Sequence, residues 1–208
     1  MKTVLIPFTS GLDSTYLIYN AMKEGLDVRL FVTKLLNNKM QTRAEDFARK
    51  KILRVIKSEK FLLDYDLRGR VDERLIINKI EVSGMSRLRL AQPPMWILGS
   101  LYSMPSDVDE IWFGYVGGDD ALGYLDDIRE IYKSLECFLS PGEKFPDIVF
   151  PLKRNFKFDL LNDIPKELFE LISWCEMPSY KNRKYLPCGK CGSCKKMDKA
   201  LLESKGTD

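Results

Sequence analysis

Histidine is absent from the 208-residue sequence. Its absence excludes a histidine general base, a Ser-His-Asp triad and every histidine-ligated metal site. Long apolar runs are missing too, so the sequence predicts no membrane-spanning helix and no membrane partner. The short apolar run at the N-terminus breaks at Pro7, and we expect it to form a first strand rather than a secretory signal.

Cysteine is scarce, with five residues in the chain. Because no secretory signal is expected, these cysteines indicate a reducing, cytoplasmic location, where thiolates bind metal more often than they form disulfides. An excess of charge is also missing, since 33 basic and 30 acidic residues leave a net charge of +3. This balance argues against nucleic acid as the main partner. Apolar residues make up 45% of the chain, which is typical of a folded protein with a full core.

Apolar runs rich in β-forming residues alternate with helical patterns along most of the chain. We expect strands at 4–8, 28–33, 61–65 and 110–115, and helices at 14–23, 42–55, 94–101, 126–140 and within 160–172. Strands that alternate with helices imply βαβ units and a mainly parallel sheet. In such sheets, ligands bind beyond the carboxyl ends of the strands, so Phe8, Thr33 and Gly114 should lie near the functional site.

A loop of small residues joins the first expected strand to the first expected helix. It comprises Phe8, Thr9, Ser10, Gly11, Leu12, Asp13, Ser14 and Thr15. Small residues let backbone N–H groups approach an oxyanion, and the helix N-terminus adds the positive end of its dipole. The carboxylate of Asp13 would repel a phosphate unless it holds Mg²⁺ or orients the loop. The same residues also fit a plain strand-to-helix turn with a Ser or Thr cap, and the loop alone leaves both interpretations open.

Four cysteines gather near the C-terminus. Cys175, Cys188, Cys191 and Cys194 have the spacing C-x12-C-x2-C-x2-C. Four thiolates satisfy tetrahedral Zn²⁺ and leave no open position for a substrate, so we predict a structural zinc site, with an iron–sulfur cluster as the rival interpretation. We expect an α/β domain at 1–172 with a zinc-binding segment, 173–208, packed on it. The fifth cysteine, Cys137, we expect to be an inert, partly buried thiol.

The loop resembles the pyrophosphatase-loop (PP-loop) signature Ser-Gly-Gly-x-Asp-Ser/Thr, which here reads Thr9-Ser10-Gly11-Leu12-Asp13-Ser14. Enzymes with this signature cleave ATP between its α and β phosphates, transfer AMP to an oxygen and release pyrophosphate. The loop and the cysteine block together resemble the QueC family of 7-cyano-7-deazaguanine synthases. The resemblance implies a Rossmann-like fold of the adenine nucleotide alpha hydrolase (HUP) type, with helices on both faces of a parallel sheet and a C-terminal zinc-binding segment.

Weaker matches to the family lie between these two motifs. They are Arg43-Ala44-Glu45, Gly114 followed by Gly118-Asp119 and Gly123-Tyr124-x-Asp126, and Pro151-Leu152-x4-Lys157. The resemblance implies that Asp13, Ser14 and Lys157 are catalytic. It implies that the whole loop, Thr33, Arg43 and Gly114 bind the nucleotide, and that Gly118, Asp119, Gly123, Tyr124 and Asp126 bind the substrate. Each of the weaker matches also fits a plain turn or a solvated helix face, and only their order relative to the two motifs favours function.

The sequence departs from the family before the apolar helix at 94–101. Where the family has Pro-Gly-Arg-Asn, this chain has Pro93-Pro94-Met95-Trp96, which removes a cation and an amide from a region near the nucleotide. Arg87 and Arg89 are candidates to replace the cation. Trp96 could stack on a flat heterocycle or lie in the core.

The resemblance implies an ATP-dependent ligase that needs ATP, Mg²⁺ and Zn²⁺. It would convert 7-carboxy-7-deazaguanine to 7-cyano-7-deazaguanine (preQ0) through an acyl-adenylate, with ammonia as the nitrogen source, and a homodimer is the expected assembly. An alternative is a QueC-like ligase of a defence or phage system that couples the adenylated carboxylate to another amine, on a partner protein for example. A third is a non-catalytic zinc-ribbon module that binds RNA through the basic residues around the cysteines, namely Lys181, Arg183, Lys184, Lys190, Lys195 and Lys196.

Overall fold

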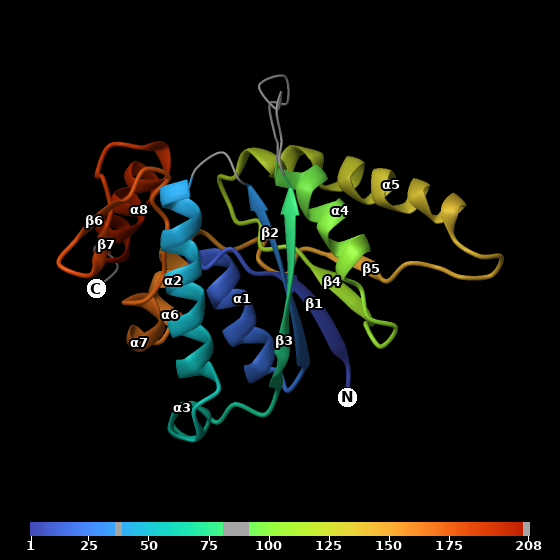
Figure 1. Ribbon diagram of the computed structural model, residues 1–208, viewed down its shortest axis with the longest axis horizontal. Coiled ribbons are helices and arrows are strands. Elements are labelled where there is room, and N and C mark those ends of the chain that lie inside the picture. The colour runs from blue at the N-terminus through green and yellow to red at the C-terminus, as the bar shows by residue number, and fades with distance from the viewer. Residues whose placement is uncertain (36–38, 81–91, 206–208) are drawn as a thin grey trace.

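The computed structural model describes the chain apart from residues 36–38, 81–91 and 206–208, and Figure 1 shows its path. Five strands form one sheet in the order β3-β2-β1-β4-β5, and all neighbouring strands are parallel. The strands are β1 (Thr3–Pro7), β2 (Asp27–Leu35), β3 (Arg70–Ile80), β4 (Glu110–Trp112) and β5 (Asp147–Val149). The chain runs outward from β1 first on one side and then on the other, which places a topological switch point between β1 and β4. This order confirms the predicted Rossmann-like fold.

Helices cover both faces of the sheet (Figure 1). One face carries α1 (Leu12–Lys23), α2 (Lys39–Ile56), α3 (Glu59–Asp64), α6 (Lys157–Asp163) and α7 (Lys166–Phe169). The other face carries α4 (Gln92–Ser103) and α5 (Leu125–Ser134), with the short 3₁₀ helices η2 (Asp120–Tyr124) and η3 (Leu135–Phe138) on either side of α5.

The central strand β1 explains why both faces are covered. Its side chains are all buried, and they alternate: Val4 and Ile6 pack in the core beneath α1 and α2, whereas Leu5 packs in the core beneath α4 and α5. A strand that is apolar on both faces is stable only between two helical layers. The first apolar run of the sequence therefore becomes the middle of a three-layer domain.

The strand predicted at 61–65 is wrong, because these residues form α3. Ser58 caps this helix, since its Oγ accepts a hydrogen bond from the N–H of Phe61 at 3.3 Å. Phe61 is buried in the core beneath α2. A short helix can bury such a side chain on one face as well as a strand can, so the apolar run alone does not distinguish the two. The third strand is the later run at β3, and the short β5 was not predicted.

The helix predicted within 160–172 is broken into α6 and α7. Pro165 lies between them, and Ile164 before it has an extended backbone with ψ of 132°. A proline disfavours helical geometry in the preceding residue, which ends α6 at Asp163. The helix predicted at 126–140 likewise ends earlier, at Ser134, and continues only as η3.

The C-terminal segment adds a small hairpin and a helix to the domain. The hairpin consists of β6 (Ser179–Lys181) and β7 (Lys184–Leu186), and α8 (Gly192–Ser204) follows it. Met197 of α8 shares a core with Leu160 of α6, so this helix packs on the α/β domain. The division of the chain at residue 172 stays a prediction. Within the described part of the chain, no helix has the length and apolar character to cross a membrane.

Candidate active site and metal centre

A cleft of about 600 Å³ opens at the carboxyl ends of β1, β2 and β4, at the switch point of the sheet. Nine of the residues predicted from the sequence to be functional line it: Thr9, Gly11, Leu12, Asp13, Ser14, Thr33, Gly114, Asp119 and Lys157. Segments distant in the sequence thus meet in one hollow. Its size is typical of a site for a nucleotide or a similar small molecule.

The loop after β1 forms the floor of this cleft. Helix α1 begins at Leu12, and its N-cap residue is Gly11, which has no side chain to cap the first turn. The hydroxyl groups of Thr9 and Ser14 share a hydrogen bond of 3.0 Å at the same end of the helix. Backbone N–H groups and hydroxyls grouped at a helix N-terminus favour an anion, and a phosphate fits this arrangement.

Ser10 has an unusual backbone for a residue with a side chain. Its φ is 62°, in the left-handed region that glycine adopts most easily, and the residue is fully buried. Its Oγ donates to the carbonyl of Glu45 in α2 at 3.3 Å, and its own carbonyl accepts from the N–H of Ser173 at 2.8 Å. The PP-loop signature has glycine at this position, and here the serine adds a link to α2 while keeping the same turn.

Arg49 of α2 holds the loop from behind, and the sequence analysis did not identify it. Only 2% of its side chain is exposed, and it donates to the carbonyl of Phe8 at 3.4 Å and to Asp46 at 2.5 Å. The available signal was an arginine beside the apolar face of an amphipathic helix, whose buried members include Ala48 and Ile52. Because a buried arginine needs partners, it ties the end of β1 to α2.

Asp13 and Lys157 form an ion pair inside the cleft. Nζ of Lys157 lies 2.8 Å from Oδ1 and 2.6 Å from Oδ2 of Asp13. Burial raises the pKa of the Asp13 carboxyl above its ordinary value, Lys157 opposes this increase, and the nearby Asp119 adds to it. A cation and two carboxylates therefore face the loop, which is the charge set that a phosphate group with a bound divalent cation requires.

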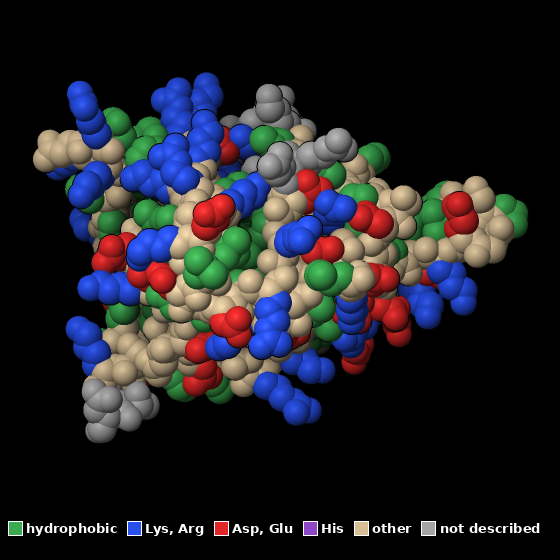
Figure 2. Space-filling model, turned by 90° about the horizontal axis from the view of Figure 1, so that it is seen from below, with side chains coloured by type: hydrophobic (Ala, Val, Ile, Leu, Met, Phe, Trp, Pro, Cys, Tyr) green, Lys and Arg blue, Asp and Glu red, His purple; other side chains and the backbone are tan. Residues whose placement is uncertain are grey.

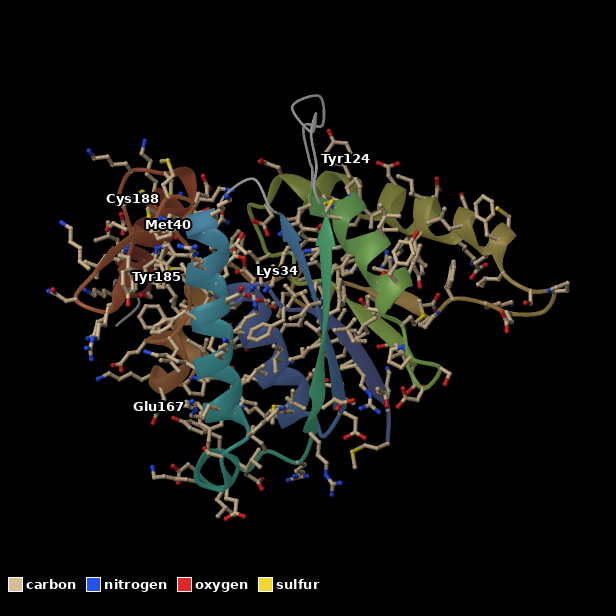
Figure 3. All side chains as sticks on the ribbon, in the orientation of Figure 1. Lys34, Met40, Tyr124, Glu167, Tyr185 and Cys188 are labelled. Carbon is tan, nitrogen blue, oxygen red and sulfur yellow. The ribbon has the colours of Figure 1, made fainter. Side chains whose placement is uncertain are left out.

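The other predicted site residues lie away from the cleft wall. Phe8, Ser10 and Thr15 are buried behind the loop. The remaining five, Arg43, Gly118, Gly123, Tyr124 and Asp126, are exposed and are not part of the lining that the described residues form. Figure 3 shows Tyr124 at the top of the molecule, near the start of α5. The roles of all the site residues stay predictions.

Two aromatic residues form a wall of the cleft that the sequence indicated only in part. Trp96 of α4 stacks on Tyr115, with ring centroids 5.0 Å apart and planes 30° apart, and both residues line the cleft. Trp96 also packs on Phe113, so it lies both in the core and at the cleft. Helix α4 can approach β2 closely because residue 99 is a glycine. A Cβ atom at this position would collide with Thr33 and Phe31.

Tyr115 carries a polar group into this wall. Its hydroxyl is buried, and no partner for it lies among the described residues. Burial raises the pKa of this hydroxyl, which keeps it neutral. Trp96 and Tyr115 thus form a neutral wall, next to the positions of Met95 and Trp96 where the resemblance implies a cation and an amide. Arg87 and Arg89, the candidates to replace that cation, lie outside the described residues.

The four cysteines near the C-terminus converge. The Sγ atoms of Cys175, Cys188, Cys191 and Cys194 all lie within 4.8 Å of one another. Zn–S bonds of about 2.3 Å in a tetrahedron require Sγ atoms roughly 3.8 Å apart, so small adjustments suffice. All four are free thiols, and the cluster could bind zinc. Cys137 is exposed in η3, which corrects the expectation that it is partly buried.

Backbone groups support negative charge on Cys188, whereas burial raises the pKa of the Cys175 and Cys194 thiols. The N–H groups of Lys190 and Cys191 both donate to Sγ of Cys188 at 3.4 Å, and they lower the pKa of this thiol to about 6. The N–H of Cys188 donates to Sγ of Cys175 at 3.2 Å. Thiolates are the form that binds metal, so the local backbone favours a metal site.

The cysteine cluster also positions a part of the cleft. Cys191 is the N-cap of α8, and this helix and the segment before Cys175 bring five residues into the lining: Ser173, Trp174, Ser193, Lys196 and Met197. Gln41, Thr42 and Glu45 of α2 line the cleft as well. None of these eight was predicted to line the cleft, because their positions depend on how α2 and α8 dock.

The comparison with protein families agrees with the motifs. The family model for the queuosine biosynthesis protein QueC matches residues 3–205. None of the curated proteins compared matches the sequence. Among solved structures, an NMN synthetase from Francisella tularensis is 16% identical with a TM-score of 0.36, and the match covers 80% of this chain and 64% of that one.

Proposed function

Because the chain belongs to the QueC family, we propose that it converts 7-carboxy-7-deazaguanine to 7-cyano-7-deazaguanine, using ATP and ammonia. Members of this family are ATP-utilising enzymes of the PP-loop class. The observation that carries the proposal is that Lys157, from the far end of the domain, meets Asp13 of the loop inside one cleft. Loop, cation and carboxylate are together where an ATP-dependent adenylation needs them.

The loop is proposed to hold the phosphates of ATP. The N–H groups of the first turn of α1 and the hydroxyls of Thr9 and Ser14 would contact phosphate oxygens. Lys157 would turn from Asp13 towards these oxygens and neutralise the charge that grows on the departing pyrophosphate. Asp13 would then be free to hold Mg²⁺, which supplies further charge neutralisation when it is bound.

The chemistry starts with an acyl-adenylate. An oxygen of the substrate carboxylate attacks the α-phosphorus, the bond from this phosphorus to the bridging oxygen breaks, and pyrophosphate leaves. Ammonia then adds to the acyl carbon, loses a proton and displaces AMP, which gives an amide. The amide oxygen attacks the α-phosphorus of a second ATP and releases a second pyrophosphate, and loss of AMP and of both amide protons leaves the nitrile. Positioning and electrostatics supply the rate, so the lack of histidine is no obstacle.

The wall beside β4 is proposed to hold the deazaguanine ring. Trp96 offers an aromatic surface, and the carboxylate of Asp119 suits the N–H groups on the edge of a guanine-like ring. Asp119 is oriented for this role because its Oδ2 already accepts a hydrogen bond of 3.0 Å from the N–H of Val116. This assignment leaves the side of the cleft next to Thr33 and α2 for the adenosine.

The second candidate function keeps the adenylation and changes the acceptor. The Trp96 wall is the observation that favours it, because the cation and amide typical of the family are missing at this point. A ligase of this kind would pass the adenylated carboxylate to an amine on a partner protein and stop at the amide. A non-catalytic zinc-ribbon module that binds RNA is the third candidate.

One assay separates these candidates. Pyrophosphate release is measured with ATP, Mg²⁺, 7-carboxy-7-deazaguanine and ammonia, for the wild type and for Asp13→Ala, and the product mass is determined. Nitrile supports the synthase, whereas turnover only after a partner protein is added supports the ligase. Equal rates for wild type and variant, or no release under any condition, would contradict adenylation at this loop.

A further inference from the structure

A strongly basic surface lies outside the cleft, on the outward side of α2 and on the C-terminal segment beside it. Figure 2 shows Lys and Arg side chains gathered at the left and upper left of the molecule, where these elements lie. Twelve exposed cations form this basic surface. Six lie on α2 or directly after it: Lys39, Arg43, Lys50, Lys51, Arg54 and, one residue beyond the helix, Lys57. The other six belong to the C-terminal segment: Lys181, Arg183, Lys184, Lys190, Lys195 and Lys196.

The cations of the basic surface form no salt bridges with the carboxylates of the described residues, whereas cations elsewhere do, such as Lys2 with Glu110 and Lys60 with Asp64. Since the whole chain has a net charge of only +3, the rest of the chain is net negative. The fold therefore gathers on one side a positive potential that the overall composition hides.

Aromatic rings lie between these cations. Phe47 of α2 contacts Tyr185 of the hairpin at 5.6 Å between ring centroids, and Tyr185 contacts Tyr180 at 4.9 Å. Phe47 is 37% exposed and Tyr180 is 53% exposed, and Nζ of Lys51 lies 4.2 Å from the ring centre of Phe47. Figure 3 shows Tyr185 between the hairpin and α2. The row of rings joins the two halves of the basic surface.

Cations and exposed rings together indicate the chemistry of the partner. An acidic protein would match the charge but has no need of open aromatic faces. Single-stranded nucleic acid uses both, since its phosphates contact cations and its unpaired bases stack on aromatic rings. The stretch of α2 from Lys39 to Ile56 is about 27 Å long, which is sufficient for several successive phosphates.

We propose that the basic surface binds single-stranded nucleic acid, with phosphates along α2 and bases on Tyr180 and the neighbouring rings. The surface adjoins the cleft, because Lys196 belongs to both and because α2 presents Glu45 to the cleft and Arg43 to solvent. Binding here is independent of the reaction proposed above, since it requires neither ATP nor the deazaguanine.

The test is fluorescence anisotropy of a labelled single strand of about 15 nucleotides, the upper range for one binding site, as RNA and as DNA, without ATP or substrate. The full zinc-loaded chain is used. Contacts with five phosphates predict that log K falls against log salt with a slope of about −3.5. Removing two contacts in Lys50→Glu/Lys184→Glu should reduce this slope to about −2, while Lys133→Glu/Lys144→Glu, with the same change of charge elsewhere, should leave it unchanged.

The aromatic part is tested by Tyr180→Ala, which should weaken binding about 5- to 150-fold, as expected for the loss of one stacked base. Thermal unfolding of each variant checks that the fold is kept, and Tyr180→Phe, which retains the ring, should bind as the wild type does. The proposal is overturned if neither RNA nor DNA binds at 50 mM salt, or if a poly-aspartate peptide of equal length competes as well as RNA. An unchanged affinity of a folded Tyr180→Ala variant would overturn it equally.

Discussion

Lys157, at the start of α6, holds both carboxylate oxygens of Asp13, at the start of α1, although 144 positions separate the two residues in the sequence. The pair lies inside the cleft and keeps the lysine next to the expected position of the phosphates. In the protein without ligand, each side chain neutralises the other. ATP and Mg²⁺ would provide each with a new partner of opposite charge.

Replacing Lys157 by methionine should reduce pyrophosphate release about 10²- to 10³-fold, because one donor to the developing charge is lost. The measurement is the initial rate at saturating ATP. Lys153→Met removes an exposed lysine outside the cleft and should keep the wild-type rate. A folded Lys157→Met protein with the wild-type rate would exclude the lysine from the reaction.

The pKa of Asp13 predicts a pH dependence of stability. Burial raises this pKa in the folded protein, so the folded state binds the proton more tightly than the unfolded state does. Stability from this group is present at low pH and is lost as pH rises through the ordinary value of 3.8 towards the raised one. The free energy of unfolding of the wild type should therefore fall relative to that of Asp13→Asn as pH rises from acid to neutral. Urea unfolding of both proteins along this series measures the two free energies. If the wild type instead became more stable relative to Asp13→Asn as pH rises, the direction of the shift would be contradicted.

The aromatic wall predicts a selective effect on one substrate. Trp96→Leu removes the ring surface next to Tyr115 and should raise KM for 7-carboxy-7-deazaguanine about tenfold, within the range for loss of an aromatic contact, with KM for ATP nearly unchanged. Steady-state kinetics with each substrate varied in turn gives both values. An increase in KM for ATP alone would place the adenine, rather than the deazaguanine, on this wall.

The four-cysteine cluster predicts one zinc ion per chain. Cys191→Ser should lose the metal and lower the unfolding temperature, because a structural zinc site contributes directly to folding. It should also lower activity, since α8 brings Ser193 and Lys196 into the cleft. Elemental analysis and thermal unfolding are the measurements, and Cys137→Ser is the matched control, with an exposed thiol outside the cluster. Iron in place of zinc would identify the rival cluster.

The features that the sequence predicted correctly are local ones. The PP-loop lies between an apolar run and a helical pattern, and its residues are contiguous, so its place after β1 follows from the pattern alone. The cysteine cluster is nearly as local, because three of its four members lie within seven positions. The third strand was misplaced because Phe61 and its apolar neighbours fit a strand or a short helix equally well, and only the cap at Ser58 and the contact with the core decide between them.

By itself, the sequence determined the alternating α/β fold, the loop at the end of β1 and the thiol cluster, since each depends on residues close together in the chain. The tertiary structure alone decided which distant residues face one another. The order of the strands brings Lys157 to Asp13, and the docking of α8 brings Lys196 to the cleft. The pairing of α2 with the hairpin turns a nearly neutral composition into a basic surface. Contacts of this kind depend on the sheet order and helix packing of the whole domain, which no local pattern encodes.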